Sequence, residues 1–252
     1  MDKFYTKPEI VEKCVPYFSP YVVGEKVVEP SAGNGAFAKY VDLMLDIKPE
    51  GPNILQQDFF QFDSSAYKNY LGNPPFGTNS QLAKNFINHA AKGKGVIGFI
   101  LPITFRKVSL QNLIDLNFHL LEDIRLPVNA FVAKREGEWV DYPVPCVFQV
   151  WGYHEECREK ITLPLSHPDF DFVEEKDDWS FSIRRVGQAA GKVLDPEKTG
   201  KAPSHYFIRA SAEVRERLEY LYEDFNEQAC LSVYPSLGKG ELVKIYSDFA
   251  SQ

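Results

Sequence analysis

An almost unbroken apolar run at residues 95–102 constrains the fold of this chain more than any other segment. A run without polar alternation is typical of a strand buried on both faces, as in parallel sheets covered by helices. Further strand patterns lie at 26–29, 54–58, 121–126 and 144–151, and they alternate with helical patterns at 36–44, 80–91 and 110–116. This alternation predicts a doubly wound, Rossmann-like α/β sheet. A first helix is expected before it, capped by Thr6 and with Pro8 in its first turn.

The strand and helix pattern fades after residue 155. Prolines at 164, 168, 196 and 203 interrupt the remainder, and only residues 212–225 have a clear amphipathic helical pattern. We therefore divide the chain into a core at 1–155 and a small appended module at 156–252. The module is not expected to have an independent hydrophobic core.

The composition is that of an ordinary soluble globular protein, with 44% hydrophobic and 25% charged residues. The sequence has no apolar run of membrane-spanning length, and its amino-terminal residues do not form a signal-peptide pattern. The four cysteines form no CxxC pair, so no metal site is expected and a reducing intracellular setting fits best. Cytoplasm and nucleus both fit, and a viral or phage source is left open.

The net charge of −7 argues against a protein that coats nucleic acid through charge alone. The stretch from Trp179 to Ser211 departs from this average, because it carries +4 and the remainder of the chain −11. Aromatic residues are interleaved with its basic residues, an arrangement that can hold single-stranded or flipped nucleotides. A solvated basic face over ordinary core aromatics is the alternative.

The glycine turn Gly33-Asn34-Gly35 lies between a predicted strand and a predicted helix. Glycines at this point let the backbone approach a ligand closely, although a purely structural tight turn has the same sequence. Asp46 is placed where the second strand should end, so its oxygens suit the two hydroxyls of a ribose. Asp58 ends the third strand and suits an adenine amino group, with Phe59 packing the ring. Because the segment after Gly35 is short, Asp42 remains an alternative for the ribose.

The sequence Asn73-Pro74-Pro75-Phe76 carries the strongest functional signal. The prolines fix the backbone and donate no hydrogen bond, so the loop is rigid and its carbonyls are available. An amide before the prolines and an aromatic ring after them suit a planar molecule with an exocyclic amine. A surface turn closed by a buried Phe is the alternative.

Together these segments resemble the S-adenosylmethionine-dependent adenine-N6 methyltransferases of nucleic acids that have an Asn-Pro-Pro-Phe loop. The matching segments are Phe4-Tyr5-Thr6, residues 29–37, Gln57-Asp58-Phe59 and Asn73-Pro74-Pro75-Phe76, and the resemblance spans residues 4–151. It implies a methyltransferase sheet, with target recognition in the carboxyl-terminal module because only 14 residues separate Asp58 from Asn73.

The resemblance implies a role for each matched residue. Asn73 and Pro74 would accept the hydrogens of the target amine, and Phe76 would stack on a flipped or unpaired adenine. Pro75 would also contact the substrate. S-adenosyl-L-methionine would be held by the following residues: Tyr5, Thr6, Ala32, Gly33, Gly35, Asp46, Asp58 and Phe59.

Nucleic acid is the expected partner, with DNA preferred because the motif order resembles DNA enzymes and RNA as the alternative. Arg184 and Arg185 of the basic stretch are the expected phosphate contacts, and Asn129 and Phe131, in a loop before the last core strands, could support the target pocket. Two other functions stay open: an N-methyltransferase for ribosomal RNA guanine or protein glutamine, and a catalytically idle nucleic-acid-binding subunit.

Overall fold

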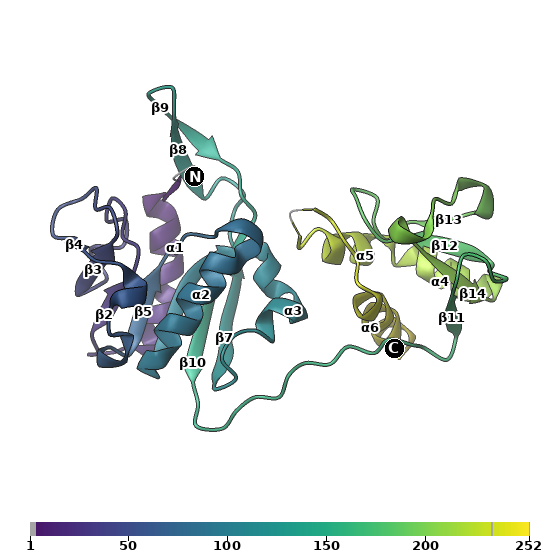
Figure 1. Cartoon of the computed structure of the whole chain (residues 1–252), viewed down its shortest axis with the longest axis horizontal. Coiled ribbons are helices and arrows are strands. Elements are labelled where there is room, and N and C mark those ends of the chain that lie inside the picture. Colours follow the sequence, from purple (N-terminus) through teal and green to yellow (C-terminus); the bar gives the residue numbers. More distant parts are fainter. Residues whose placement is uncertain (1–3, 233, 252) are drawn as a thin grey trace. The chain divides into compact units, whose positions relative to one another are not determined.

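A computed structural model describes residues 4–232 and 234–251 of the chain. The chain divides after Lys160 into a first unit, which ends there, and a second unit that begins at Ile161 (Figure 1). Short 3-10 helices connect the main elements: Ser19–Tyr21, Phe59–Gln61, Ser64–Ala66, Thr78–Ser80, Ala91–Gly93, Ile103–Arg106, Pro196–Lys198 and Ala202–Ser204. In the described part of the chain, no helix has the length and apolar character needed to cross a membrane.

Seven strands of the described chain form the main sheet of the first unit, in the order β4-β3-β2-β5-β6-β10-β7. The first five run parallel, and β10 runs antiparallel to both β6 and β7. Their bounds are β2 Val27–Glu29, β3 Leu43–Asp46, β4 Leu55–Gln56, β5 Asn69–Gly72, β6 Val96–Pro102, β7 Phe118–Arg125 and β10 Cys146–Tyr153. The predicted α/β fold with a mostly parallel, Rossmann-like sheet is therefore confirmed.

The order of the strands reverses between β2 and β5. From β2 the chain adds β3 and then β4 on one side, and it returns to add β5 and β6 on the other. In open α/β sheets, the crevice at such a reversal, beyond the carboxyl ends of the strands, is where ligands bind. Here those ends are Glu29 of β2 and Gly72 of β5.

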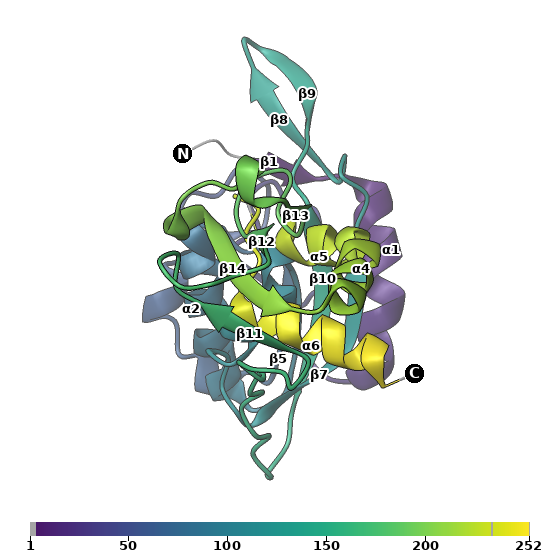
Figure 2. The ribbon, with the colours of Figure 1, turned by 90° about the vertical axis from the view of Figure 1, so that its right-hand side faces the viewer.

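Helices cover both faces of the main sheet. Helices α1 (Pro8–Phe18) and α2 (Gln81–Ala90) lie on opposite faces (Figures 1 and 2). The buried face of α1 packs on one set of alternating strand residues, including Leu71, Ile100 and Phe148. Period-2 alternation sends the intervening residues to the α2 side. The predicted helix at 80–91 is thus confirmed.

Three local predictions were wrong. Residues 36–44 do not form a helix: residues 33–39 form turns and β3 begins at Leu43, because too few residues separate β2 from β3. The predicted helix at 110–116 is instead α3, a single turn at Val108–Gln111. Thr6 does not cap α1, since it lies in a strand and Lys7 occupies the N-cap position without a side-chain bond.

A small sheet joins the amino terminus to a hairpin that the sequence prediction treated as loop. Strand β1 (Phe4–Thr6) pairs with β8 (Phe131–Arg135), which pairs with β9 (Glu138–Tyr142). Glu136 and Gly137 turn the hairpin with φ of 50° and 92°, a conformation that favours glycine. The tip of the hairpin projects beyond the main sheet of this unit (Figures 1 and 2). Phe131 is therefore a buried strand residue, and its prediction as a loop residue was wrong.

The second unit has a hydrophobic core of its own, so the expectation that it lacks one was wrong. Its sheet has the order β11-β14-β12-β13, with bounds Phe170–Val173, His205–Ala210, Phe181–Arg184 and Val193–Leu194. The helices are α4 (Ala212–Tyr220), α5 (Tyr222–Ala229) and α6 (Lys239–Ala250). Buried side chains of the sheet, such as Ile183 and Ile208, pack against Leu218, Phe225 and Leu242 of the helices. The prediction of one helix at 212–225 missed the break at Leu221.

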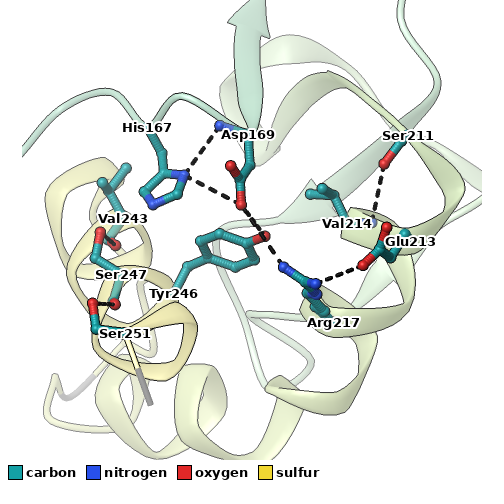
Figure 3. A network of polar contacts seen from close by, with 10 residues as sticks. All are labelled: His167, Asp169, Ser211, Glu213, Val214, Arg217, Val243, Tyr246, Ser247 and Ser251. Atoms are coloured by element: carbon teal, nitrogen blue, oxygen red, sulfur yellow. Dashed lines mark hydrogen bonds and ion pairs between the residues drawn. The ribbon is translucent and has the colours of Figure 1, made fainter.

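A polar network links the elements of the second unit (Figure 3). The Tyr246 hydroxyl of α6 donates to Asp169 Oδ2 at 2.8 Å, and Arg217 of α4 lies 4.0 Å from the same oxygen. Arg217 also pairs with Glu213 one turn earlier. The network connects α4 and α6 to the chain just before β11, and this structural role explains its contacts.

Gly98 of β6 is a sensitive test of how closely α1 packs on the main sheet. A Cβ at Gly98 would lie 2.6 Å from Phe18 Cδ2 and 3.0 Å from Phe148 Cζ. Gly98→Ala should therefore lower the free energy of unfolding by about 1–3 kcal/mol, as overpacked cores do. In a double variant, Phe18→Leu should recover part of this loss in urea unfolding monitored by tryptophan fluorescence. Strictly additive losses would show that the two residues do not meet.

Candidate functional site

The Asn-Pro-Pro-Phe loop begins at the carboxyl end of β5, directly at the strand-order reversal. Two hydrogen bonds fix its first residue: Asn73 Nδ2 donates to the Thr6 hydroxyl at 3.1 Å, and Ser31 Oγ donates to the Asn73 carbonyl at 3.2 Å. The remaining side-chain atom, Asn73 Oδ1, is buried and has no hydrogen-bond partner in the described chain. A buried acceptor without a partner is costly, so its retention suggests a ligand donor.

The aromatic residue of the loop has a less open position than the sequence suggested. Phe76 is half-buried, and its ring lies 5.1 Å from the Phe4 ring and 6.3 Å from the Phe131 ring. Pro74 is buried and Pro75 is partly exposed. Phe76 is therefore held by the sheet of β1 and β8, and only part of its ring remains for stacking.

The chain leaves the loop through a tight, strained turn. Gly77, Asn79 and Ser80 have φ of 69°, 51° and 62°, in the left-handed region that disfavours side chains. A Cβ at Gly77 would lie 2.7 Å from Leu82 Cβ, and the Phe76 carbonyl accepts from the Leu82 amide. Such strain persists only where the surroundings enforce it, often at functional sites.

The glycine turn lies beside this loop, at the carboxyl end of β2. Gly33 and Gly35 have φ of 54° and 84°, so both need the freedom of glycine. Asp46, the last residue of β3, holds the turn: its Oδ2 accepts from the Gly33 amide at 2.7 Å and its Oδ1 from the Lys48 amide at 2.7 Å. Each carboxylate oxygen keeps a further lone pair, which can accept from a ligand hydroxyl. Ala32 is buried beneath the turn.

Asp42, the alternative ribose ligand, lies at the opposite edge of the main sheet. Its Oδ2 accepts from the Val27 amide at 2.9 Å, at the amino end of β2. Ligands bind beyond the carboxyl ends of parallel strands, where Asp46 lies. The geometry therefore favours Asp46 over Asp42.

Tyr5 covers the glycine turn from the side of β1. Its Cε1 lies 3.9 Å from where a Cβ of Gly33 would be, and its hydroxyl donates to Glu50 Oε2 at 2.5 Å. The Trp139 ring of β9 packs edge-on against it at 5.2 Å. Burial and the bond to the Glu50 carboxylate raise the pKa of Tyr5 to about 12, so the phenol stays protonated near neutral pH.

A pocket of about 630 Å³ opens beside Tyr5. Of the eight predicted cofactor residues, three line it: Tyr5, Thr6 and Gly35. The other five do not, and neither does the predicted catalytic residue Asn73. Trp139, which is 56% exposed, forms part of its wall from the hairpin. Sequence reasoning missed Trp139 because it did not recognise the hairpin.

The roles predicted for Asp58 and Phe59 fare differently. Asp58 lies just beyond the carboxyl end of β4, and its Oδ1 accepts from the Phe60 amide at 2.9 Å. The Phe59 ring, by contrast, is only 2% exposed and packs against Tyr70, Phe86 and other aromatic rings. It fills the core under α2, so a role for this ring in packing the cofactor adenine is not supported.

Glu29 is a candidate site residue to which the sequence analysis gave no role, although it lies in the matched segment 29–37. It ends β2 at the strand-order reversal, is 2% exposed, and its Oε2 has no hydrogen-bond partner in the described chain. Burial raises the pKa of Glu29 well above its usual value, and the nearby Asp46 carboxylate adds to the effect. The sequence signal that could have identified Glu29 was its position: a carboxylate at the end of the first strand, shortly before the glycine turn.

The basic stretch lies in the second unit, and two of its four interleaved aromatics are buried. Phe181 lies in the core of that unit, whereas Phe207 is buried on the other face of β14, where Trp179 packs on it at 4.9 Å. Arg185 lies over the Tyr206 ring at 5.2 Å. Burial of Phe181 and Phe207 removes two of the four aromatics from a nucleotide-binding surface, and Trp179 and Tyr206 remain half-buried. The interpretation of the stretch as a nucleotide-binding surface stays a prediction.

Arg184 and Arg185 themselves lie at the end of β12. Arg184 is exposed, and its Nε donates to the Val186 carbonyl at 3.1 Å. Arg185 Nε is buried without a hydrogen-bond partner in the described chain. Their assignment as phosphate contacts stays a prediction. No cluster of metal-ligating side chains occurs among the residues that the structure describes.

The pH dependence of stability offers a test of the Glu29 environment. Because the pKa of Glu29 is higher in the folded than in the unfolded chain, its contribution is present at low pH and is lost as pH rises through the folded pKa. Glu29→Gln should remove this loss, so the variant gains stability relative to wild type between pH 5 and pH 8. Urea unfolding at both pH values measures the difference. Glu25→Gln, at an exposed carboxylate, is the matched control, and an equal gain in both variants would contradict the assignment.

Comparisons with known proteins show likeness at the level of the fold. No protein-family model and no curated protein matches the chain. Three solved structures align with it at a TM-score of 0.43 each. A Pyrococcus horikoshii protein described as a suspected RNA methyltransferase, PH1948, is 12% identical over 58% of this chain and 82% of its own. A Thermoplasma acidophilum protein, 1320, is 18% identical over 60% and 89%, and the 23S rRNA methyltransferase ErmE is 13% identical over 62% and 71%. Likenesses this distant carry no argument about activity, so the site is interpreted from its own geometry.

Proposed function

We propose that this protein is an S-adenosylmethionine-dependent N-methyltransferase that acts on the exocyclic amine of adenine in nucleic acid. The observation that carries the proposal is Asn73 Oδ1, a buried acceptor without a partner in the described chain, at the strand-order reversal. Thr6 fixes the amide through its Nδ2, which leaves the oxygen as the atom available to a substrate.

The residues around the glycine turn fit the proposed cofactor. Asp46 and Glu50 place carboxylates beside the turn, and Glu29 adds a buried carboxyl with an unused oxygen. An acidic surface suits a ligand that carries both a sulfonium and an ammonium group. When bound, S-adenosylmethionine supplies a methyl group on a positively charged sulfur. Asp46 is assigned to the ribose, Tyr5 and Thr6 to the methionine end, and Asp58 to the adenine.

The Asn-Pro-Pro loop overcomes the weak nucleophilicity of the target amine. The lone pair of an aromatic amine is delocalised into its ring, so the nitrogen must pyramidalise before it can attack. Asn73 Oδ1 and the Pro74 carbonyl accept its two hydrogens and thereby favour the developing positive charge. Because both acceptors belong to a rigid loop, they also hold the nitrogen in line for attack.

Completion of the reaction requires no covalent bond to the protein. With the cofactor bound, the amine nitrogen held by Asn73 and Pro74 would take the methyl group, and the electron pair of the broken carbon–sulfur bond would stay on the sulfur. The methylated nitrogen then loses one of its two protons to water. Asn73 and Pro74 accept hydrogen bonds throughout and take no proton, because an amide oxygen is too weak a base to hold a proton near neutral pH.

The choice of adenine over other amines rests on the sequence. The segment Phe4-Tyr5-Thr6 belongs to the adenine-N6 pattern, and in this structure it is the segment that contacts both Asn73 and Phe76. The preference for adenine over the guanine and glutamine alternatives rests on the resemblance of this segment, and the fixed Asn73 amide argues against an idle subunit. The preference for DNA over RNA has only the motif order in its favour, so both polymers belong in the assay.

Cofactor binding tests the acidic residue at the end of β3. S-adenosylmethionine should bind with a Kd in the micromolar range, about 8 kcal/mol, by calorimetry. Asp46→Ala should weaken it by about tenfold or more, since charge-assisted hydrogen bonds are lost. Asp42→Ala is a matched control, because it also removes a carboxylate that accepts a strand amide, but at the opposite edge. Equal losses in the two variants would refute the ribose assignment.

Methyl transfer tests the proposed reaction. Labelled methyl should pass from the cofactor to DNA or RNA, and nucleoside analysis should recover N6-methyladenine. Asn73→Ala should lower turnover by about a hundredfold or more, as the loss of a charge-stabilising contact does, and should leave cofactor affinity nearly unchanged.

Thr78→Ala, at an exposed position of the same loop segment, is the control and should keep most of the turnover. Near-normal turnover in Asn73→Ala would end the proposed mechanism. Label found only in protein or in guanine would refute adenine as the target and favour the protein glutamine or the ribosomal RNA guanine alternative.

A further inference from the structure

The carboxyl edge of the main sheet is divided by charge at the strand-order reversal. On one side, the segments that follow β2, β3 and β4 (residues 29–35, 46–53 and 56–60) contain the carboxylates Asp46, Glu50 and Asp58, with Lys48 as the opposing cation. This is the side assigned above to a cationic cofactor.

The other side has the opposite sign. The segments that follow β5, β6 and β7 (residues 72–80, 102–107 and 125–130) contain Arg106, Lys107 and Arg125 and no carboxylate. Arg106 pairs with Asp123 within β7 at 3.0 Å, whereas Arg125 is exposed and Lys107 half-buried. In a chain of net charge −7, a run of cations along one half of one edge is a local departure from the average.

The strand register brings these cations to the same edge as the Asn-Pro-Pro loop. Val147 of β10 pairs with Arg125 of β7 and with Leu101 of β6, while Phe99 of β6 pairs with Gly72, the residue before Asn73. Neighbouring strands lie about 4.8 Å apart, so the three steps from β5 to β7 place Arg125 about 15 Å from the loop. A few nucleotides of an extended strand span that distance.

We propose that Lys107 and Arg125 bind phosphates of the target strand next to the adenine held by Asn73. The inference rests on the proposed function and adds the surface along which the nucleic acid lies. Both side chains have interaction partners within the chain, as Arg106 has in Asp123. The proposal therefore rests on their charge and their position at this edge. Like-charge repulsion also separates the two ligands. The cations on the target side disfavour the cationic cofactor there, and the carboxylates on the cofactor side disfavour the anionic nucleic acid.

The surface differs from the one that the sequence suggested. Arg184 and Arg185 belong to the second unit, where two of the four interleaved aromatics, Phe181 and Phe207, are buried. Lys107 and Arg125 belong to the unit that contains the loop, on segments fixed by the same sheet. Contact with a flexible strand near the reacting base then needs no element outside this unit.

A salt titration of nucleic-acid binding by the full chain tests the proposal. The probes are a labelled single-stranded RNA and the DNA of the same sequence. Lys107→Gln with Arg125→Gln should weaken binding and flatten the plot of log affinity against log salt by about 1.4, since each phosphate contact on a single strand contributes about 0.7. Cofactor affinity by calorimetry should not change.

Two further double variants serve as controls for this result. Lys26→Gln with Lys68→Gln removes the same charge from exposed lysines at the amino edge of the same sheet, and it should keep the wild-type slope. Arg184→Gln with Arg185→Gln tests the second unit, and the proposal expects the larger change in the Lys107 and Arg125 pair.

A wild-type slope in the Lys107 and Arg125 variant, or an equal loss in the amino-edge pair, would overturn the inference. If wild type methylates nucleic acid while the slope is unchanged, the inference alone fails. If wild type binds neither polymer and methylates only protein, the proposed function fails, and the inference fails with it.

Discussion

The hydrogen bond from Asn73 Nδ2 to the Thr6 hydroxyl is the contact on which the candidate site depends. It joins the loop after β5 to β1, and β1 is in turn held by β8. The same strand places Tyr5 over the glycine turn and Phe4 against Phe76. The pleat of the strand lets β1 contact both the Asn-Pro-Pro-Phe loop and the glycine turn. Phe4 and Thr6 face the loop, and Tyr5 points to the opposite face. The bond also decides which atom of the Asn73 amide remains for a substrate.

Charge is the second organising feature of the first unit. Carboxylates follow the strands on one side of the order reversal, and cations follow those on the other. Each side can therefore attract a ligand of the opposite sign without a large net charge on the protein. Glu29 lies at the boundary, buried and with one unused oxygen, where burial favours its neutral form. A neutral carboxyl at that point can accept from or donate to a ligand, which suits the place where the two ligands would meet.

The errors of the sequence-based predictions have physical causes. Residues 36–44 have a helical pattern, but the short connection between parallel neighbours β2 and β3 leaves room only for turns. Phe59 follows a carboxylate in a motif, yet its ring packs against Tyr70 and Phe86. For the aromatics of the basic stretch the sequence left two interpretations open, and the structure buries Phe181 and Phe207 while Trp179 and Tyr206 stay half-buried. The hairpin of β8 and β9 had a local signal, the two-residue turn Glu136-Gly137 between short strands, which the sequence analysis did not use.

The sequence by itself determined most strands of the main sheet, the two helices that cover it, and the residue types at its carboxyl edge. These follow from local periodicity and from glycine and proline, whose backbone restrictions act within a few residues. The tertiary structure decided which of those residues meet. Asp46 rather than Asp42 supports the glycine turn, because parallel pairing with β2 puts the two carboxylates at opposite edges. The unused oxygens of Asn73 and Glu29 likewise became visible only in the structure, since burial and the absence of a partner depend on contacts between distant parts of the chain.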